Sequence, residues 1–173
     1  MNTDKRSGGG TNEEREDLIG EHPMGDGGQI VLFLLFLAIW VADSFFLKYS
    51  TFLTQYASPY IRIPLAVLIL VFSAYLARSG LGIVFGEKRE KPEVIRKGVF
   101  NIVRHPIYLS ALLFYVALLV ASFSLLAFAV WIVTVLFYIY ISRYEEKLLK
   151  ERFGKDYEEY MKEVPMLFPK IRS

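Results

Sequence analysis

The hydrophobic residues of this chain stand in solid blocks, and this arrangement limits the folds that are open to it. Of its 173 residues, 54% are hydrophobic. The blocks show neither the 3.6-residue period of an amphipathic helix nor the alternation of a half-buried strand. Apolar runs of about 18 residues are long enough to cross a bilayer as helices. The sequence therefore predicts an all-α integral membrane protein.

We predict four transmembrane helices, at about residues 30–47, 61–77, 107–121 and 125–141. The stretch 105–142 contains no Asp, Glu, Lys or Arg. At about 1.5 Å per residue it is too long for one span and long enough for two short ones. Its only polar break, Ser122-Phe123-Ser124, marks the turn between them. A short loop over 48–60 joins the first two spans, and Pro64 is assigned to the first turn of the second, where proline is tolerated.

Polar segments flank these spans. Residues 1–28 are rich in Gly, Asn, Glu and Asp, which predicts a disordered N-terminal tail ahead of a membrane domain over 29–173. Gly25-Asp26-Gly27-Gly28 is interpreted as a linker, because no strand precedes it and no Lys-Ser/Thr follows it. A loop is predicted over 78–106, basic as far as 104, with glycines at its start that make it flexible or closely packed.

The C-terminal segment 143–173 is predicted to be a soluble, amphipathic helical tail. Gly154 is expected to separate two helices, and Pro165 is expected to end the second. The apolar face of this tail could lie on the membrane or on the basic loop.

Lysine and arginine are distributed very unevenly between the two sides of the predicted membrane. Of the 20 such residues, all but Lys48 and Arg62 fall in the N-terminal tail, the central loop or the C-terminal tail. The positive-inside rule then places both termini and the central loop in the cytosol. Four spans satisfy this arrangement, whereas three or five do not. We expect no signal peptide, and the compact four-span plan favours a prokaryotic cytoplasmic membrane.

Composition also excludes some classes of function. A net charge of +2 is too small to argue for nucleic-acid binding. The chain has no cysteine, hence no thiolate nucleophile and no Cys-type metal site, and we predict no metal. Asp43 is an acid inside the first span and thus a functional candidate, although its position near the end of that span, close to Lys48, favours a structural role. The oligomeric state stays open.

The predicted topology brings two polar stretches to the same cytosolic face, because Gly98–Tyr108 and Glu145-Glu146 bracket one helical hairpin. Pro106 suits the first turn of the third span. The backbone N–H groups that follow it, around Ile107 and Tyr108, can hold an anion such as a carboxylate. Glu145 can accept from an ammonium group across the site. Together these groups suit an amino-acid zwitterion.

A specific family pattern runs through these stretches: Arg104-His105-Pro106-x-Tyr108, Glu145-Glu146, Phe153-Gly154-x-x-Tyr157-x-x-Tyr160 and Val164-Pro165-x-x-x-Pro169. Over about residues 80–170 the chain resembles the isoprenylcysteine carboxyl methyltransferase family, which is grouped with the phospholipid N-methyltransferases. The resemblance implies S-adenosylmethionine bound at the cytosolic face. It also implies a lipophilic acceptor, a small molecule or a lipid, that enters from the surrounding membrane lipids.

The resemblance carries over to individual positions. The cofactor-binding residues that it implies are Val94, Ile95, Phe100, Arg104, His105, Pro106, Ile107, Tyr108, Glu145 and Glu146. Among them, we assign His105 and Glu145 as the candidate catalytic residues. Phe100 stands where the family often has Tyr, and Val94 with Ile95 and Phe100 could hold a flat base.

Three positions depart from the family pattern. Ile141 stands where eukaryotic relatives place an Arg attributed to the acceptor carboxylate. Arg143 is the nearest basic residue and becomes the candidate substrate-binding residue. Met166 replaces a common Arg, and Ser110 replaces a frequent small Gly. These changes leave the cofactor site credible and the acceptor open.

Several functions remain open at this point. The acceptor could be an isoprenylcysteine-like carboxylate, an aminophospholipid or a small apolar thiol. A carboxylate needs no general base, whereas an amine or a thiol must first lose a proton, for which His105 is the candidate base. A membrane reductase of sterol type would instead bind a reduced nicotinamide nucleotide. A membrane scaffold or transporter would tolerate His105→Ala and Glu145→Ala, although no chain of intramembrane charges supports transport.

Overall fold

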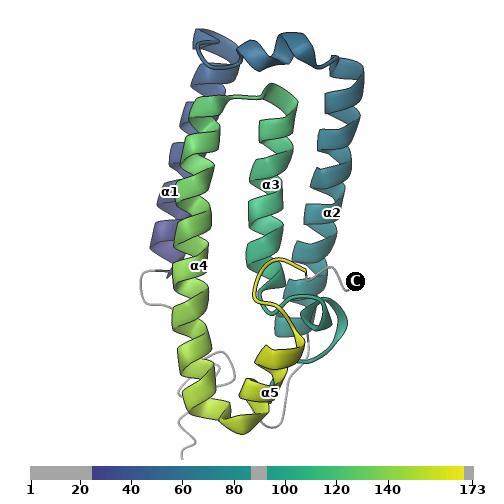
Figure 1. Ribbon diagram of the computed structural model, residues 1–173, viewed down its shortest axis with the longest axis vertical. Helices are drawn as coiled ribbons and strands as arrows, with labels where there is room; N and C mark the ends of the chain where they lie inside the picture. The colour runs from purple at the N-terminus through teal and green to yellow at the C-terminus, as the bar shows by residue number, and fades with distance from the viewer. Residues whose placement is uncertain (1–24, 87–92, 170–173) are drawn as a thin grey trace, which may run out of the picture.

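The computed structural model describes residues 25–86 and 93–169, and these residues form helices and no strand. The elements are α1 (Gly25–Val41), η2 (Ala42–Leu47), η3 (Phe52–Tyr56), α2 (Pro59–Phe85), η4 (Gly98–Asn101), α3 (Pro106–Ser122), α4 (Leu125–Phe153) and α5 (Lys155–Glu163). Figure 1 shows α1 to α4 side by side as an elongated bundle, with α5 near one end. The all-α prediction is confirmed for the described residues. The disordered tail was predicted over 1–28; residues 1–24 lie outside the described residues, whereas 25–28 belong to α1.

The four long helices associate as two close pairs, α2 with α3 and α1 with α4. A core cluster joins α1, α3, α4 and the C-terminal segment; its buried members are Phe36, Leu112, Tyr115, Leu119, Ala127, Tyr138, Ile141 and Leu167. A second cluster, Leu76, Val99, Phe100, Val103 and Leu109, packs α2 against η4 and α3. Outside these contacts the bundle exposes large apolar side chains, for example Leu68 on α2 and Leu136 on α4. Apolar outward faces are expected of helices surrounded by lipid.

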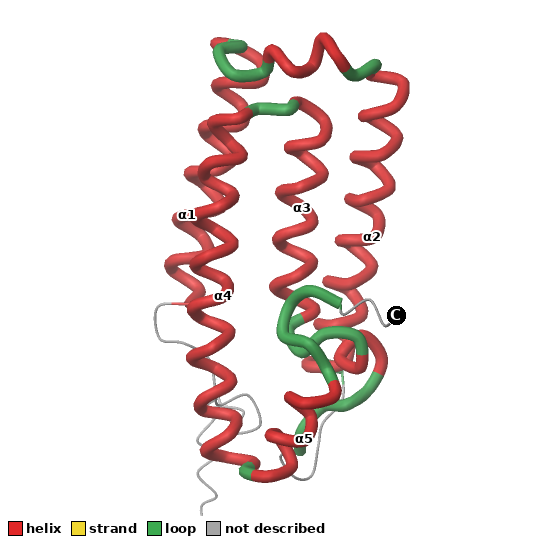
Figure 2. Tube along the Cα trace, in the orientation of Figure 1, coloured by secondary structure: helices red, strands yellow, loops and turns green. Residues whose placement is uncertain are grey.

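Three helical segments are long and apolar enough to cross a membrane: Gly25–Leu47, Pro59–Phe85 and Leu125–Phe153. The fourth, α3, is apolar and has 17 residues. At 1.5 Å per residue it reaches about 26 Å, close to the roughly 30 Å of a bilayer's hydrocarbon core. Figure 2 shows that loops connect the long helices at both ends of the bundle, so α3 runs beside the other three.

The first helix begins earlier than predicted. Gly25 to Gly28 belong to α1, so the interpretation of this stretch as a linker is wrong. The reason is packing: a Cβ on Gly28 would lie 2.3 Å from the ring of Phe137, so this glycine lets α1 approach α4 closely. A glycine in a sequence can mark close helix contact as well as a chain break.

The second helix is also longer than predicted at both ends. Ser58 caps it by accepting from the N–H of Tyr60 at 3.3 Å, and Pro59 occupies its first turn. Pro64 therefore lies inside the helix and not in its first turn, and the predicted 48–60 loop contains η3. The helix continues to Phe85 through the stretch predicted as loop. Gly80 contacts α3 there, since a Cβ on it would lie 2.9 Å from Ile107 Cγ1.

The hairpin of α3 and α4 has the predicted turn. Phe123 adopts a left-handed conformation, and Ser124 caps α4 by accepting from the N–H of Ala127 at 3.1 Å. The predicted end of the fourth span near 141 does not end the helix, because α4 runs on through charged residues to Phe153. Gly154, with φ +55°, separates α4 from α5 as predicted. The second tail helix ends at Glu163, just before Pro165.

At the end of the bundle opposite α5, the buried side chain of Asp43 connects several segments through hydrogen bonds. It is 1% exposed and accepts from the N–H of Ser50 at 3.0 Å, the Ser50 hydroxyl at 2.5 Å and the Ser124 hydroxyl at 2.5 Å. The network joins the end of α1, the following loop and the turn between α3 and α4. These partners support the structural role predicted for this acid, because a buried carboxylate needs several donors to persist.

We expect Asp43→Ala to destabilise the folded bundle by about 1–3 kcal/mol, because two buried hydroxyls would lose their acceptor. The measurement is thermal unfolding in detergent, followed by the fluorescence of Trp40 and Trp131. Trp40 is a local probe, since its ring N–H donates to Ser122 at 2.9 Å. Asp26→Ala, at an exposed position in the first turn of α1, is the matched control. Equal effects of the two changes would contradict the role assigned to Asp43.

Candidate active site at the start of the third helix

The chain enters α3 through a tightly specified turn. Gly98 has φ +56°, a left-handed conformation that favours glycine, and a Cβ there would lie 2.8 Å from Ile83 on α2. His105 is non-helical at φ −120°, as the residue before a proline tends to be. Pro106 opens α3, and no side chain caps this helix start. The backbone N–H groups of a helix's first turn have no acceptor within the helix, so this helix start is a place where an anion can bind.

Arg104 binds three parts of the chain together. Its Nε donates to Glu146 Oε1 at 2.7 Å, and both side chains are 8% exposed. Its Nη1 donates to the carbonyls of Met161 at 2.9 Å and Val164 at 2.5 Å. The Arg104 N–H also donates to the Pro165 carbonyl at 2.9 Å. The start of α3, the polar end of α4 and the segment after α5 are thus fixed to one another.

His105 lies between the two glutamates. Its Nε2 is 3.3 Å from Glu146 Oε1, and its Nδ1 is 3.5 Å from Glu145 Oε2. Its ring stacks on Tyr108 with centroids 5.5 Å apart and planes within 3°. The Tyr108 hydroxyl donates to Glu145 Oε1. The structure therefore brings together His105, Tyr108, Glu145 and Glu146, four of the residues that the sequence placed at the site.

Glu146 is held as a carboxylate. Burial alone would raise its pKa, but hydrogen bonds from His105 and Arg104 and the charge of Arg104 outweigh burial and leave the pKa below its ordinary value. Glu146 is therefore charged at neutral pH although it is 6% exposed.

A cavity of about 110 Å³ lies beside this cluster. Four of its lining residues, Val94, Ile95, Phe100 and Arg104, were predicted for the cofactor; the others are Glu93, Leu149, Arg152, Phe153, Tyr157 and Tyr160. Tyr160 closes one wall by donating its hydroxyl to the Phe100 carbonyl at 2.6 Å. The apolar face of α5 therefore packs on the basic loop, which was one of the two predicted alternatives. Most of the wall residues are aliphatic or aromatic, which suits a flat base, and Glu93, Arg104 and Arg152 add charged groups.

Three predicted residues are placed differently from this cluster. The Pro106 and Ile107 side chains pack toward Gly80 of α2, away from the cluster. Arg143 is exposed and lines a separate groove together with Lys147. Ile141, at the position where relatives have Arg, is fully buried in the core.

Tyr138 also belongs beside the cluster but was not predicted from the sequence; its ring lies 5.1 Å from that of Tyr108. It stands seven residues before Glu145 on α4, two turns away on the same face. That spacing could have identified it. Leu149 and Arg152 also line the cavity and were not predicted for the site.

The comparison with known families decides the assignment. Residues 61–156 match the family described as phospholipid methyltransferase, and this range includes all of α3 and α4 and all four residues of the cluster. The chain belongs to the phospholipid methyltransferase family. The predicted family membership is therefore confirmed.

One curated relative is protein-S-isoprenylcysteine O-methyltransferase B of Arabidopsis thaliana, which is 35% identical to this chain over 95 residues. The match covers 53% of this chain and 47% of the relative, so the chain spans about half the length of that protein. No solved structure matches the chain.

We expect Glu146→Gln to lower the thermal midpoint at neutral pH, because Arg104 would be left buried without its carboxylate, a loss of about 3–5 kcal/mol. In the wild type, the depressed pKa of Glu146 makes its stabilisation complete above the unfolded-state value, near about 4.3. That stabilisation is lost as pH falls through the lower folded-state pKa. The variant should lack this acid step when thermal midpoints are compared between pH 3 and pH 7.

Glu158→Gln is the matched control, since Glu158 pairs with Lys150 at an exposed position on α5. It should keep both the neutral midpoint and the acid step. If the thermal midpoint of Glu146→Gln falls between pH 7 and pH 3 by as much as that of the wild type, other carboxyl groups cause the loss of stability in acid.

Proposed function

We propose that this protein is an S-adenosylmethionine-dependent methyltransferase that modifies a lipophilic acceptor at the membrane surface. The observation that carries the proposal is the cluster of His105, Tyr108 and Glu145 at the uncapped start of α3, inside the family match.

The residues present fit the amino-acid part of the cofactor. The N–H groups of the first turn of α3 suit its carboxylate, and Glu145 suits its ammonium group. Glu145 already accepts from Tyr108, but a carboxylate has about four acceptor positions. Its side chain is 13% exposed against 8% for Glu146, so it is the more accessible of the two acids.

The base of the cofactor would take the cavity beside Phe100. This cavity shares Arg104 with the buried ion pair, so base and amino-acid groups would lie on opposite sides of one fixed residue. Leu149, Phe153, Tyr157 and Tyr160 cover it from α4 and α5. Since its volume is about 110 Å³, we propose that the α5 segment moves outward to admit a nucleoside.

A separate apolar recess suits the hydrocarbon part of the acceptor. It has a volume of about 390 Å³ and lies between α1 and the α3–α4 hairpin; its lining is Gln29, Ile30, Phe33, Ala111, Phe114, Tyr115 and Tyr138. Tyr138 is the link to the cluster, because its ring contacts Tyr108. Its hydroxyl donates to Gln29 at 3.2 Å. A lipid tail in this recess would bring its polar end toward Tyr108 and Glu145.

The bound cofactor supplies a methyl group that is already activated on a sulfonium, so the protein's part is to position the partners and exclude water. Tyr108 and His105 form a stacked wall, and Glu145 orients the polar end of a ligand. A carboxylate acceptor is favoured because it needs no base and because the Arabidopsis relative is named for O-methylation. An aminophospholipid is the second candidate, favoured by the family's description. In that case His105 would accept the proton.

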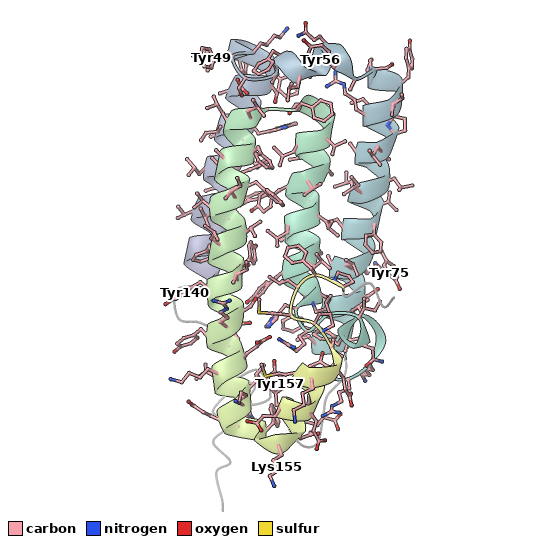
Figure 3. The ribbon with its side chains drawn as sticks, viewed as in Figure 1. Tyr49, Tyr56, Tyr75, Tyr140, Lys155 and Tyr157 are labelled. Carbon is pink, nitrogen blue, oxygen red and sulfur yellow. The ribbon has the colours of Figure 1, made fainter. Side chains whose placement is uncertain are left out.

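We also propose that all four long helices span the bilayer, with both termini and the α3 start in the cytosol of a prokaryotic cell. Figure 3 supports a membrane zone between two levels of exposed tyrosines, with Tyr49 and Tyr56 at one end and Tyr75 and Tyr140 toward the other. Exposed aromatic residues gather at membrane interfaces. The α3 start lies on the side of Tyr75 and Tyr140.

The orientation can be tested by labelling, because the native chain contains no cysteine. We expect Lys155→Cys to react with an impermeant maleimide only after cells are opened, since α5 would face the cytosol. Tyr56→Cys, at the other end of the bundle, should react in intact cells. The reverse pattern would contradict the orientation, and labelling of both in intact cells would contradict the four spans.

Cofactor binding is tested by calorimetric titration of the purified protein with S-adenosylhomocysteine. We expect saturable binding that Glu145→Gln weakens on the order of 10- to 100-fold, because the amide cannot pair with the ammonium charge. The amide still accepts from Tyr108, so the fold should survive. Glu159→Gln, on the exposed face of α5, should bind like the wild type.

Absence of binding to folded wild-type protein would overturn the proposed cofactor. Reduced nicotinamide nucleotides would then be titrated in the same way, and their saturable binding would favour a sterol-type reductase.

A further inference from the structure

A basic groove lies between α4 and α5, beside the Arg104–Glu146 ion pair. Its volume is about 400 Å³, and it is lined by Arg143, Glu146, Lys147, Lys150, Glu151 and Met161. The three cations stand at spacings of four and three residues on α4. Residues with this spacing share one face of a helix. Arg143, Lys147 and Lys150 therefore form a row of positive charges along the α4 side of the groove.

This row of charges stands where α4 leaves its apolar zone. No charged residue occurs in α4 before Ser142, and Arg143 is the first. Tyr140 and Tyr144, on either side of Arg143, are 59% and 36% exposed. Figure 3 shows Tyr140 on α4, nearer the middle of the bundle than α5. Aromatic and basic residues in this order mark the headgroup region of a bilayer.

The charge of the groove is only partly balanced. Lys150 pairs with Glu158 at 3.0 Å, and the charge of Glu146 is taken up by Arg104. Glu151 is exposed at the outer rim. Within residues 25–86 and 93–169, no acidic side chain lies within ion-pair distance of Arg143 or Lys147. Those two cations are available to an anion from outside the chain.

The groove is also separate from the proposed methyl-transfer site. Successive residues of an α-helix are turned by about 100°, so Glu145 projects about 200° around α4 from Arg143. Glu145 faces Tyr108, whereas the row of positive charges faces away from α3. A ligand in the groove would leave the cluster of His105, Tyr108 and Glu145 unobstructed.

We propose that this groove binds the phosphate headgroup of an anionic phospholipid of the surrounding leaflet. A planar guanidinium at Arg143 and an ammonium at Lys147 suit phosphate oxygens. Basic residues just outside a membrane span attract anionic lipids within about one Debye length, roughly 8–10 Å at physiological salt. The bound headgroup would hold the junction of α4 and α5 at the membrane surface. The proposal does not depend on the methyl-transfer reaction.

The test uses the full chain reconstituted in vesicles of phosphatidylcholine with a spin-labelled phosphatidylglycerol or phosphatidylcholine probe. The ratio of the two lipid association constants gives the preference for the anionic headgroup. We expect the wild type to prefer phosphatidylglycerol and Arg143→Gln with Lys147→Gln to reduce that preference about fivefold or more. Lys155→Gln with Lys162→Gln removes the same charge from α5 and should retain the preference. Thermal midpoints of the three proteins would verify that each is folded.

Equal loss of preference in the two double variants would overturn the site, because net charge alone would then explain the binding. An unchanged preference in Arg143→Gln with Lys147→Gln would overturn it as well. A third arm adds inorganic phosphate against chloride at equal ionic strength. Full displacement by phosphate would assign the groove to a soluble anion and contradict a lipid ligand, whereas persistence of the preference supports it.

Discussion

The buried ion pair of Arg104 and Glu146 is the contact on which the rest of the structure around the start of α3 depends. Burying two charges costs several kcal/mol for each ion, and their attraction offsets this only when the remaining donors and acceptors are satisfied. Here they are: Arg104 donates further to the Met161 and Val164 carbonyls, and Glu146 also faces His105. The pair therefore acts mainly to select one position for the segment after α5. Any shift of that segment would leave the buried charge of Arg104 without its hydrogen-bond acceptors.

That arrangement makes the C-terminal segment part of the bundle. Backbone hydrogen bonds from Arg104 and His105 reach the Pro165 and Met166 carbonyls, and Leu167 then inserts into the core at 1% exposure. Asp43 has a similar role at the opposite end of the bundle, where its hydrogen bond with Ser124 fixes the turn between α3 and α4. Between helices in lipid the hydrophobic effect gives little attraction, so polar contacts carry more of the specificity. Each end of this bundle is thus held by one buried carboxylate.

The sequence was sufficient to predict the helical class, the turn at Ser124 and the break at Gly154, because each depends on local chemistry. It was also sufficient to bring His105 near Glu145, since one apolar hairpin connects them. Helix ends were predicted poorly. Hydropathy reports where a helix leaves the apolar zone and not where its hydrogen bonding stops, so α4 continues past Arg143 without interruption. From the sequence, Gly80 could not be distinguished from a loop glycine. The structure shows that a glycine is needed there because Ile107, which is distant in sequence, packs against it.

The adjacent acids on α4 illustrate what a motif leaves unresolved. A Glu-Glu pair suggests two similar residues, but the helix turns them about 100° apart. Glu146 points to Arg104 and is held inside, whereas Glu145 points to Tyr108 and is more exposed. His105 contacts both, one at each ring nitrogen. The imidazole therefore links a carboxylate that fixes the fold to a carboxylate that can meet a ligand, and a displacement of either acid changes the position of the ring between them.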